Sequence, residues 1–219
     1  MLFFMELTNR DLQLLNDLYF VKYLNSRRIG SLFGYYKSAL RRLKGLKDEG
    51  YIKVVDFLAN GEQVFCLTKR GFNLLNKNYY YLSKNDKIIH NLLCGDFYFW
   101  LKGRGHNIEY FSIDEQVSYR YKGKNIKFRP DIIVKTDRWY LVEVDLCNKR
   151  FEEKVKKWEG YYESSIFKTR FKLFPPIIIV SNNIDKVRAI INKYRQIDLN
   201  YAYIDIEYVK NNQYTYSKT

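Results

Sequence analysis

Apolar residues in the first fifty positions recur at helical spacing in three successive segments. The first helix is expected to begin after the N-cap Thr8, the second after a cap offered by Asn25 and Ser26, and the third to cover about residues 35–49. Gly34 separates the second helix from the third, and Gly50 closes the third, as glycine commonly does at a helix C-terminus.

Two strand-like segments follow, at about residues 51–57 and 63–68, separated by the hairpin dipeptide Asn60-Gly61. Three helices and a hairpin are the element order of a winged helix-turn-helix, which is therefore expected over residues 1–83. In that fold the third helix enters the major groove and the hairpin tip approaches the DNA backbone. The residues expected to face DNA are Tyr35, Lys37, Ser38, Arg41, Arg42 and Lys44. A solvated basic face and a protein-pairing surface are the alternatives for this helix.

In residues 84–219, segments with the apolar spacing of a helix alternate with segments typical of a strand. This pattern predicts a second domain. The expected elements are a helix at 86–101, strands at 108–113, 115–121, 127–134 and 139–146, a helix at 151–164, a strand at 177–180, a helix capped by Asn183 or Asp185, and a strand at 201–209. The tail from Lys210 is expected to fray. This order predicts an α/β sandwich around a mixed central sheet, within an α+β protein, and it matches the core of the restriction-endonuclease-like fold, PD-(D/E)XK.

Two of these strands carry acids in otherwise apolar runs. Asp131 opens the first strand, and Glu143 and Asp145 lie two residues apart near the end of the second, hence on one face. Carboxylates are rare in apolar strands unless they are paired or bind a metal. The acids therefore predict a divalent-cation site of oxygen ligands, with Glu115 as an additional ligand and Mg²⁺ as the ion. Without such a site, no cofactor is expected.

Composition favours a polyanionic partner. The chain has 219 residues, 47% of them hydrophobic, with a net charge of +14 and a pI of about 9.5. Such a charge favours double-stranded DNA, and a Lys-rich solvated surface is the alternative. Cys66, Cys94 and Cys147 form no CxxC motif, so zinc is not expected and free thiols fit a reducing cytoplasm. No apolar run approaches the ~18 residues that span a bilayer, so no membrane association is expected.

Several motifs occur in a fixed order over about residues 6–180. They are Leu7-Thr8-Asn9-Arg10-Asp11, Arg41-Arg42-Leu43-Lys44-Gly45-Leu46, His90, Arg129-Pro130-Asp131, Glu143-Val144-Asp145 and a helix with Lys154, Lys157 and Tyr161. In these motifs the chain resembles the replication-relaxation family. The resemblance implies a DNA-binding accessory or initiator protein for replication or mobilisation of a plasmid or other mobile element. A relaxase, a helicase or another replication protein is the implied partner.

The resemblance to PD-(D/E)XK enzymes raises the question of nuclease activity. In active members an Asp and the first acid of the next strand hold magnesium, and a Lys two residues later positions or activates the attacking water. Asp145 stands where that Lys belongs. Some members recruit the lysine from the following helix, where Lys154 and Lys157 are candidates. The catalytic set would then be these lysines with Asp131, Glu143 and Asp145.

Three interpretations of the acids remain open at this point. They serve a metal-dependent DNA endonuclease, bind metal without cleavage, or form a non-catalytic scaffold in which they pair with Arg129, Arg150 or Lys154. The scaffold is the favoured interpretation. A transcriptional repressor whose second domain dimerises is a further alternative. A homodimer is the default expectation, because winged helices often bind inverted repeats as dimers.

Overall fold

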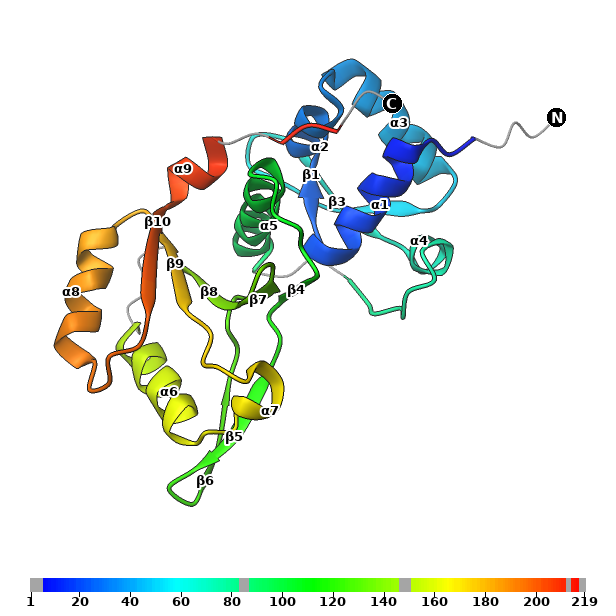
Figure 1. The fold of residues 1–219 in the computed structure, drawn as a ribbon. Helices are drawn as coiled ribbons and strands as arrows, with labels where there is room; N and C mark the ends of the chain where they lie inside the picture. Colours follow the sequence, from blue (N-terminus) through cyan, green and yellow to red (C-terminus); the bar gives the residue numbers. More distant parts are fainter. Residues whose placement is uncertain (1–5, 83–86, 146–150, 212–213, 217–219) are drawn as a thin grey trace. The chain divides into compact units, whose positions relative to one another are not determined.

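The protein is a mixed α and β chain that divides into two compact units in a computed structural model (Figure 1). The structure describes residues 6–82, 87–145, 151–211 and 214–216. The first unit comprises Met1–Arg104 and Asn212–Thr219, and the second Gly105–Asn211. Within the described ranges, no helix is long and apolar enough to cross a membrane. Cys66 and Cys94 are buried, and Cys147 lies outside the described residues.

The first unit contains five helices and three strands in its described part. They are α1 (Asn9–Val21), β1 (Leu24–Asn25), α2 (Ser26–Phe33), α3 (Tyr36–Asp48), β2 (Ile52–Phe57), β3 (Gln63–Leu67), α4 (Lys69–Leu74) and α5 (Ile88–Gly103). The expected caps are confirmed: Thr8 forms a capping box with Asp11, and the Asn25 side chain accepts from the Arg28 amide. Gly34 ends α2 with a φ of +71°, which glycine adopts at little cost.

The three strands form one antiparallel sheet in the order β1-β3-β2. The hairpin of β2 and β3 follows the sequence prediction, with a bulge between Val54 and Asp56. Strand β1 was not predicted, because two residues carry no periodicity. Its pairing places Leu24 opposite Phe65 and attaches the start of α2 to the sheet.

Helix α5 belongs to the first unit, although the sequence pattern placed a domain boundary between residues 83 and 84. It packs against α1 and β1. At Gly95, an added Cβ would lie 3.4 Å from the Val21 side chain, so the helix backbone approaches α1 closely. The apolar pattern of α5 predicts that the helix is buried, but it does not identify the element that the helix packs against. The domain boundary therefore differs from the expected one.

A buried carboxylate joins α1, α5 and the C-terminal segment. Asp17 on α1 is 1% exposed and accepts hydrogen bonds from the hydroxyls of Tyr98 and Tyr216, at 2.8 and 2.9 Å. The Lys102 ammonium lies 2.9 Å from the same carboxylate. The Tyr216 amide also donates to the carbonyl of Leu32. The expectation that the tail frays from residue 210 is therefore wrong for residues 214–216, which are held by this polar network.

The second unit is built around a five-stranded mixed sheet in the order β10-β9-β8-β7-β4. Its elements are β4 (Tyr110–Ile113), β5 (Val117–Tyr121), β6 (Lys124–Phe128), β7 (Ile132–Lys135), β8 (Trp139–Asp145), α6 (Phe151–Glu163), α7 (Lys168–Phe171), β9 (Ile177–Ser181), α8 (Ile184–Tyr194), β10 (Tyr201–Asp205) and α9 (Ile206–Asn211). Strands β4, β7 and β8 pair antiparallel, whereas β8, β9 and β10 run parallel. The mixed central sheet is as predicted.

Four details of this unit differ from the sequence prediction. The strand expected over residues 127–134 is divided into β6 and β7, and Pro130, which has no N–H to donate to a ladder, lies between them. Strands β5 and β6 form a separate two-stranded sheet. The last expected strand ends at Asp205 and continues as α9, and the short helix α7 was not predicted.

Helices α6 and α8 pack together and share a hydrophobic core with one face of the sheet. Sheet residues in this core include Ile133 of β7, Leu141 of β8 and Ile179 of β9. Because side chains alternate along a strand, Glu143 and Asp145 project to the same face as Leu141. The acids of β8 are therefore on the face that α6 covers.

Replacing Tyr216 by Phe keeps the aromatic ring and removes the hydroxyl that donates to Asp17. We expect the free energy of unfolding to fall by about 1–3 kcal/mol, because a buried carboxylate loses a donor. Urea denaturation followed by circular dichroism measures this change. Tyr81→Phe is the matched control, since that side chain is 73% exposed, and its midpoint should stay near that of the unchanged protein. Equal effects of the two substitutions would show that the Tyr216 hydroxyl does not stabilise the unit.

Candidate functional site

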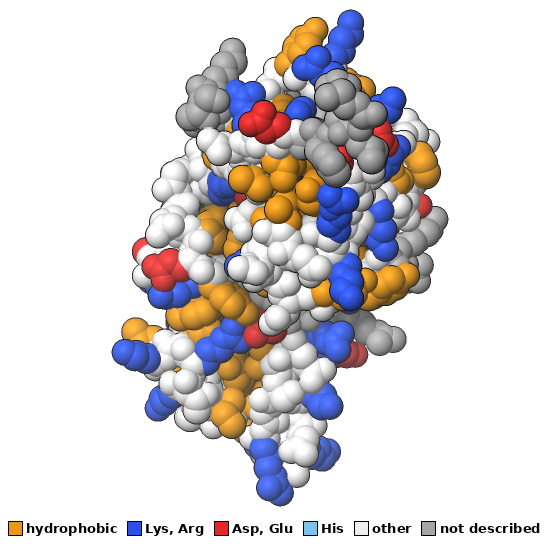
Figure 2. Space-filling view, turned by 90° about the vertical axis from the view of Figure 1, so that its right-hand side faces the viewer, with side chains coloured by type: hydrophobic (Ala, Val, Ile, Leu, Met, Phe, Trp, Pro, Cys, Tyr) orange, Lys and Arg blue, Asp and Glu red, His pale blue; other side chains and the backbone are white. Residues whose placement is uncertain are grey.

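Exposed basic side chains form a stripe along α3. Lys37, Arg41 and Lys44 are exposed and have the i, i+4, i+7 spacing of one helical face. Tyr35 and Tyr36, at the start of the helix, are 63% and 48% exposed. The stripe therefore presents cations and aromatic rings to solvent. In the face of the molecule drawn in Figure 2, Lys and Arg side chains are likewise spread over the surface, with fewer acidic ones among them.

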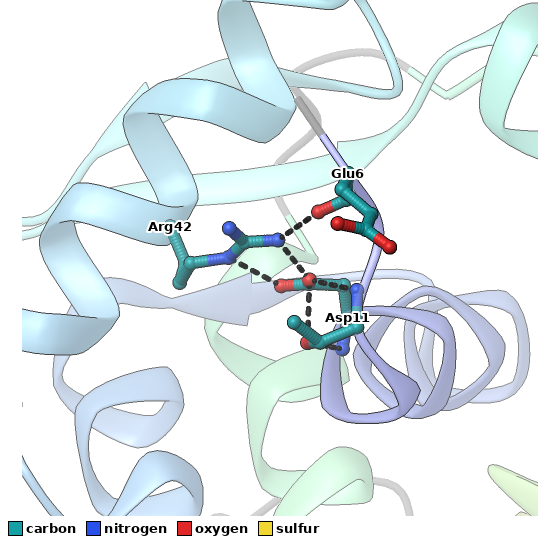
Figure 3. A network of polar contacts seen from close by, with 4 residues as sticks. Glu6, Asp11 and Arg42 are labelled. Carbon is teal, nitrogen blue, oxygen red and sulfur yellow. Dashed lines mark hydrogen bonds and ion pairs between the residues drawn. The ribbon is translucent and has the colours of Figure 1, made fainter. Parts of the chain in front are cut away.

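Arg42 does not belong to this exposed stripe, contrary to the sequence prediction. Its guanidinium forms a bidentate ion pair with the carboxylate of Asp11 and donates to the Glu6 carbonyl at 2.9 Å (Figure 3). Asp11 is 0% exposed and also accepts from the amide and hydroxyl of Thr8. Arg42 thus holds α3 against the start of α1, and leaving a buried Asp11 without it would be costly.

The pKa of Asp11 is lowered by this arrangement. Burial by itself raises the pKa, but hydrogen bonds from Arg42 and Thr8 outweigh that effect. Ser38, the other residue of α3 expected to face DNA, is half-buried and lines a hollow with Arg42 and the start of α1. Four of the six predicted residues therefore lie on the exposed stripe, and two face α1.

Gly30 of α2 sets the position of Tyr36, and the sequence pattern did not single it out. A Cβ at Gly30 would overlap the Tyr36 ring. The absence of a side chain therefore lets the ring lie against α2 and fixes the start of α3 beside it.

The second unit brings two of its predicted acids together. Asp131 and Glu143 are 8% and 1% exposed. Ile132 pairs with Val142, so the register of β7 and β8 places Asp131 across from Glu143. The amide of Val144 donates to Asp131 Oδ2 at 2.8 Å. This bond fixes the Asp131 carboxylate beside β8.

Lys154 of α6 contacts both carboxylates. Its Nζ lies 3.4 Å from Asp131 Oδ2 and forms a close ion pair with Glu143 Oε2. Burial and the charge of Asp131 raise the pKa of Glu143, against the attraction of Lys154. Burial alone would lower the pKa of Lys154, but the two carboxylates outweigh it and raise that pKa. The ammonium group therefore stays charged between the two acids, where a cation bound to both would lie.

Asp145 has a different partner at the end of the same strand. It pairs with Ser181 of β9, whose hydroxyl lies 3.5 Å from Asp145 Oδ2. The Ser181 hydroxyl also accepts from the Asn183 amide at 3.0 Å. Over the ranges that the structure describes, no group of three or more His, Cys, Asp and Glu side chains is placed to hold a metal ion.

The remaining predicted residues of this region are engaged elsewhere. Glu115 accepts from Arg170 and, at 2.6 Å, from the Tyr110 hydroxyl. Burial opposes ionisation of Glu115, but these donors outweigh it and lower its pKa. The described hydrogen bond of Lys157 is made by its backbone carbonyl, which accepts from the Tyr119 hydroxyl at 2.9 Å. Glu115 and Lys157 are therefore not joined to the acid–lysine cluster by any described bond.

Of the three basic partners proposed for the acids, Lys154 is the one that the structure places beside them. Arg129 donates to the Gln116 side chain at 3.2 Å, and Arg150 lies outside the described residues. Arg170 and Ser181 were missed as partners, because contacts between residues far apart in sequence leave no local pattern.

These observations define a two-unit α and β protein with an exposed basic helix and a buried cluster of two acids and a lysine. The replication-relaxation family matches residues 15–177. The chain belongs to the replication-relaxation family, as its motifs predicted. Membership suggests a role in replication or mobilisation.

Comparison with solved structures adds little to this assignment. The crystal structure of protein VC1899 from Vibrio cholerae matches 92% of this chain and 48% of that chain, with 14% identity and a TM-score of 0.37. The chain thus spans about half the length of that protein, and a similarity at this level carries no functional argument. No curated protein matches the chain significantly.

Replacing Lys154 by Met leaves two facing buried carboxylates without their cation. We expect the free energy of unfolding near neutral pH to fall by about 3–5 kcal/mol. A raised Glu143 pKa means that the folded state binds a proton more tightly than the unfolded state, so stability falls as pH rises through the folded pKa. The loss in free energy of unfolding relative to the unchanged protein should therefore be larger at mildly alkaline than at mildly acidic pH. Urea denaturation measures this difference.

Glu143→Gln added to Lys154→Met is the control for this charge argument. The double variant lacks one of the two uncompensated charges, so we expect it to recover part of the lost stability and most of the pH difference. A double variant no more stable than Lys154→Met at every pH would show that Lys154 acts through packing.

Proposed function

We propose that the first unit is a winged helix-turn-helix that binds double-stranded DNA, in an accessory or initiator protein for replication or mobilisation of a plasmid or other mobile element. The observation that carries the proposal is the stripe of Lys37, Arg41 and Lys44 on α3. Family membership and the order α1-α2-α3-β2-β3 support it. The positive stripe would bind phosphates, while Arg41 would contact base edges.

Under this proposal, α3 enters the major groove with the tyrosines at its start near the sugar–phosphate backbone. Arg42 acts indirectly, by fixing α3 on α1 through Asp11. The hairpin should contribute fewer phosphate contacts than the wing of a winged helix commonly makes, because residues 54–63 contain no Lys or Arg. At its tip, the Glu62 carboxylate accepts from the side chains of Asn25 and Asn60. The basic residues of α3 should therefore account for the salt dependence of DNA affinity.

The second unit, in this proposal, has a restriction-endonuclease-like fold that serves as a scaffold for a relaxase, a helicase or another replication protein. The ion pairs of Lys154 with Asp131 and Glu143 support the scaffold role, because they neutralise the acids without a metal. We also propose that the protein binds inverted repeats as a homodimer, which the stoichiometry of the protein–DNA complex would test.

Arg41→Ala should weaken binding to the cognate DNA site by about 1–3 kcal/mol and relax specificity at the contacted base. Lys44→Ala should weaken binding to all sequences and reduce the salt slope by about 1. Fluorescence anisotropy over a salt series measures both changes. Lys124→Ala, at an exposed position on β6, is the matched control and should bind as the unchanged protein does. Unaltered affinity in both α3 variants would exclude α3 as the reading element.

A metal-dependent DNA endonuclease is a second candidate, favoured by the contact of Lys154 with both Asp131 and Glu143. In this mechanism Asp131 and Glu143 would hold Mg²⁺, which would polarise the scissile phosphate and lower the pKa of a bound water. Lys154 would leave its present ion pairs and place its positive charge beside the attacked phosphate. Asp145, held by Ser181, would orient the approaching water.

The nuclease candidate predicts nicking of supercoiled plasmid DNA in Mg²⁺ or Mn²⁺ that is lost in chelator and in Glu143→Gln. Glu143→Gln should leave DNA binding unchanged, because its carboxylate is not on α3. A salt-sensitive mobility shift without cleavage in either metal would instead support the scaffold role. Cleavage that persists in Glu143→Gln would assign it to another site or to a contaminant.

A further inference from the structure

A mixed apolar and basic pocket of about 460 Å³ lies in the second unit, where β7 ends and β8 and β9 begin. Its apolar lining comes from Trp139 at the start of β8 and from the segment between α7 and β9. The lining includes Lys135, Asp137, Arg138, Trp139, Lys172 and Leu173.

The pocket is separate from the acid–lysine cluster. Trp139 is the first residue of β8 and Glu143 lies four residues later, so the two sites are separated by about 13 Å along the strand at the usual rise per residue. None of its lining residues belongs to α3. The pocket is therefore not used by either proposed function.

The rim of the pocket is cationic. Lys135, Arg138, Arg170 and Lys172 line it, against the single carboxylate of Asp137. Arg170 is held by Glu115, and Lys135 pairs with Glu109. Arg138 donates to the Tyr140 hydroxyl at 3.0 Å, and Lys172 has no ion pair among the described residues. Arg138 and Lys172 thus retain positive charge for an acidic ligand.

The Leu173 side chain is exposed to solvent beside this rim. It is 81% exposed, the largest exposed fraction among the large hydrophobic residues that the structure describes. The preceding residue, Lys172, has a φ of +62°, which is unfavourable for a residue with a Cβ, and the Leu173 amide donates to the Phe171 carbonyl at 2.7 Å. A tight, strained turn therefore presents an apolar side chain that gains nothing from folding alone.

The aromatic lining is not arranged to stack a nucleobase. The Trp139 ring is packed by Tyr110, Phe171 and the Arg170 guanidinium, with centroid distances of 5.2–5.3 Å. Phe174 packs on three other aromatic rings. Single-stranded nucleic acid is bound through open aromatic faces. The pocket instead offers covered rings and prolines, which suit an aliphatic or aromatic protein side chain.

We propose that this pocket binds an acidic segment of a partner protein, which inserts one apolar side chain beside Leu173 and places carboxylates against Arg138 and Lys172. The complementary charges would orient the segment, and the apolar anchor would supply most of the affinity. The inference goes beyond DNA binding and does not depend on it, because no residue of α3 takes part.

Panning of phage-displayed random dodecapeptides against the full-length protein tests the proposal. We expect enriched peptides to carry an apolar residue flanked by Asp or Glu. Titration calorimetry should then show that the double substitution Lys172→Glu and Leu173→Ser weakens such a peptide about tenfold or more, equivalent to about 1.4 kcal/mol. Both side chains are exposed, so the fold should be retained.

Lys124→Glu makes the same charge change elsewhere in the unit and should leave peptide affinity unchanged. Retained DNA affinity in the double variant would separate this site from the DNA-binding proposal. The inference is overturned if no enriched peptide is sensitive to the double substitution, or if Lys124→Glu weakens binding equally. It is also overturned if the substitution abolishes oligothymidylate binding instead, which would assign the pocket to single-stranded DNA.

Discussion

A carboxylate taken out of water must be given a positive partner, and this requirement recurs through the structure. Asp11, Asp17 and Glu143 are each at most 1% exposed. Each is matched by one cation from a helix later in the chain: Arg42 of α3, Lys102 of α5 and Lys154 of α6. These pairs specify which helix faces which neighbour, a choice that apolar contacts alone leave less strictly defined. The basic helix and the acid cluster both owe their geometry to such a pair.

Most elements could be predicted from the sequence, because periodicity and capping act locally. The caps at Thr8 and Asn25, the hairpin of β2 and β3, and the acid-bearing strands β7 and β8 follow from neighbouring residues. The division of the strand at Pro130 was missed, although a proline is a local feature. The two-residue strand β1 was too short to leave a pattern.

The candidate sites were harder to predict than the elements, because side-chain partners are chosen across the fold. Lys154 was proposed from its place on the helix after the acids, and it lies beside them. Arg42 looked equivalent to Arg41 in sequence, yet one helical step turns it from solvent toward the buried Asp11. Glu115 was expected beside the acids, but Arg170, fifty-five residues later, holds it. A single sequence contains no local trace of such pairings.

The return of Tyr216 to Asp17 has a consequence for the order in which the protein is made. Asp17 receives one of its hydroxyl donors from a residue that follows the whole of the second unit. On a ribosome adding about 5–20 residues per second, the first unit would wait on the order of ten seconds for that donor. During this interval Asp17 depends on Lys102 and Tyr98 alone. The first unit therefore acquires its complete native network only after the second has emerged, so vectorial synthesis and final stability are coupled.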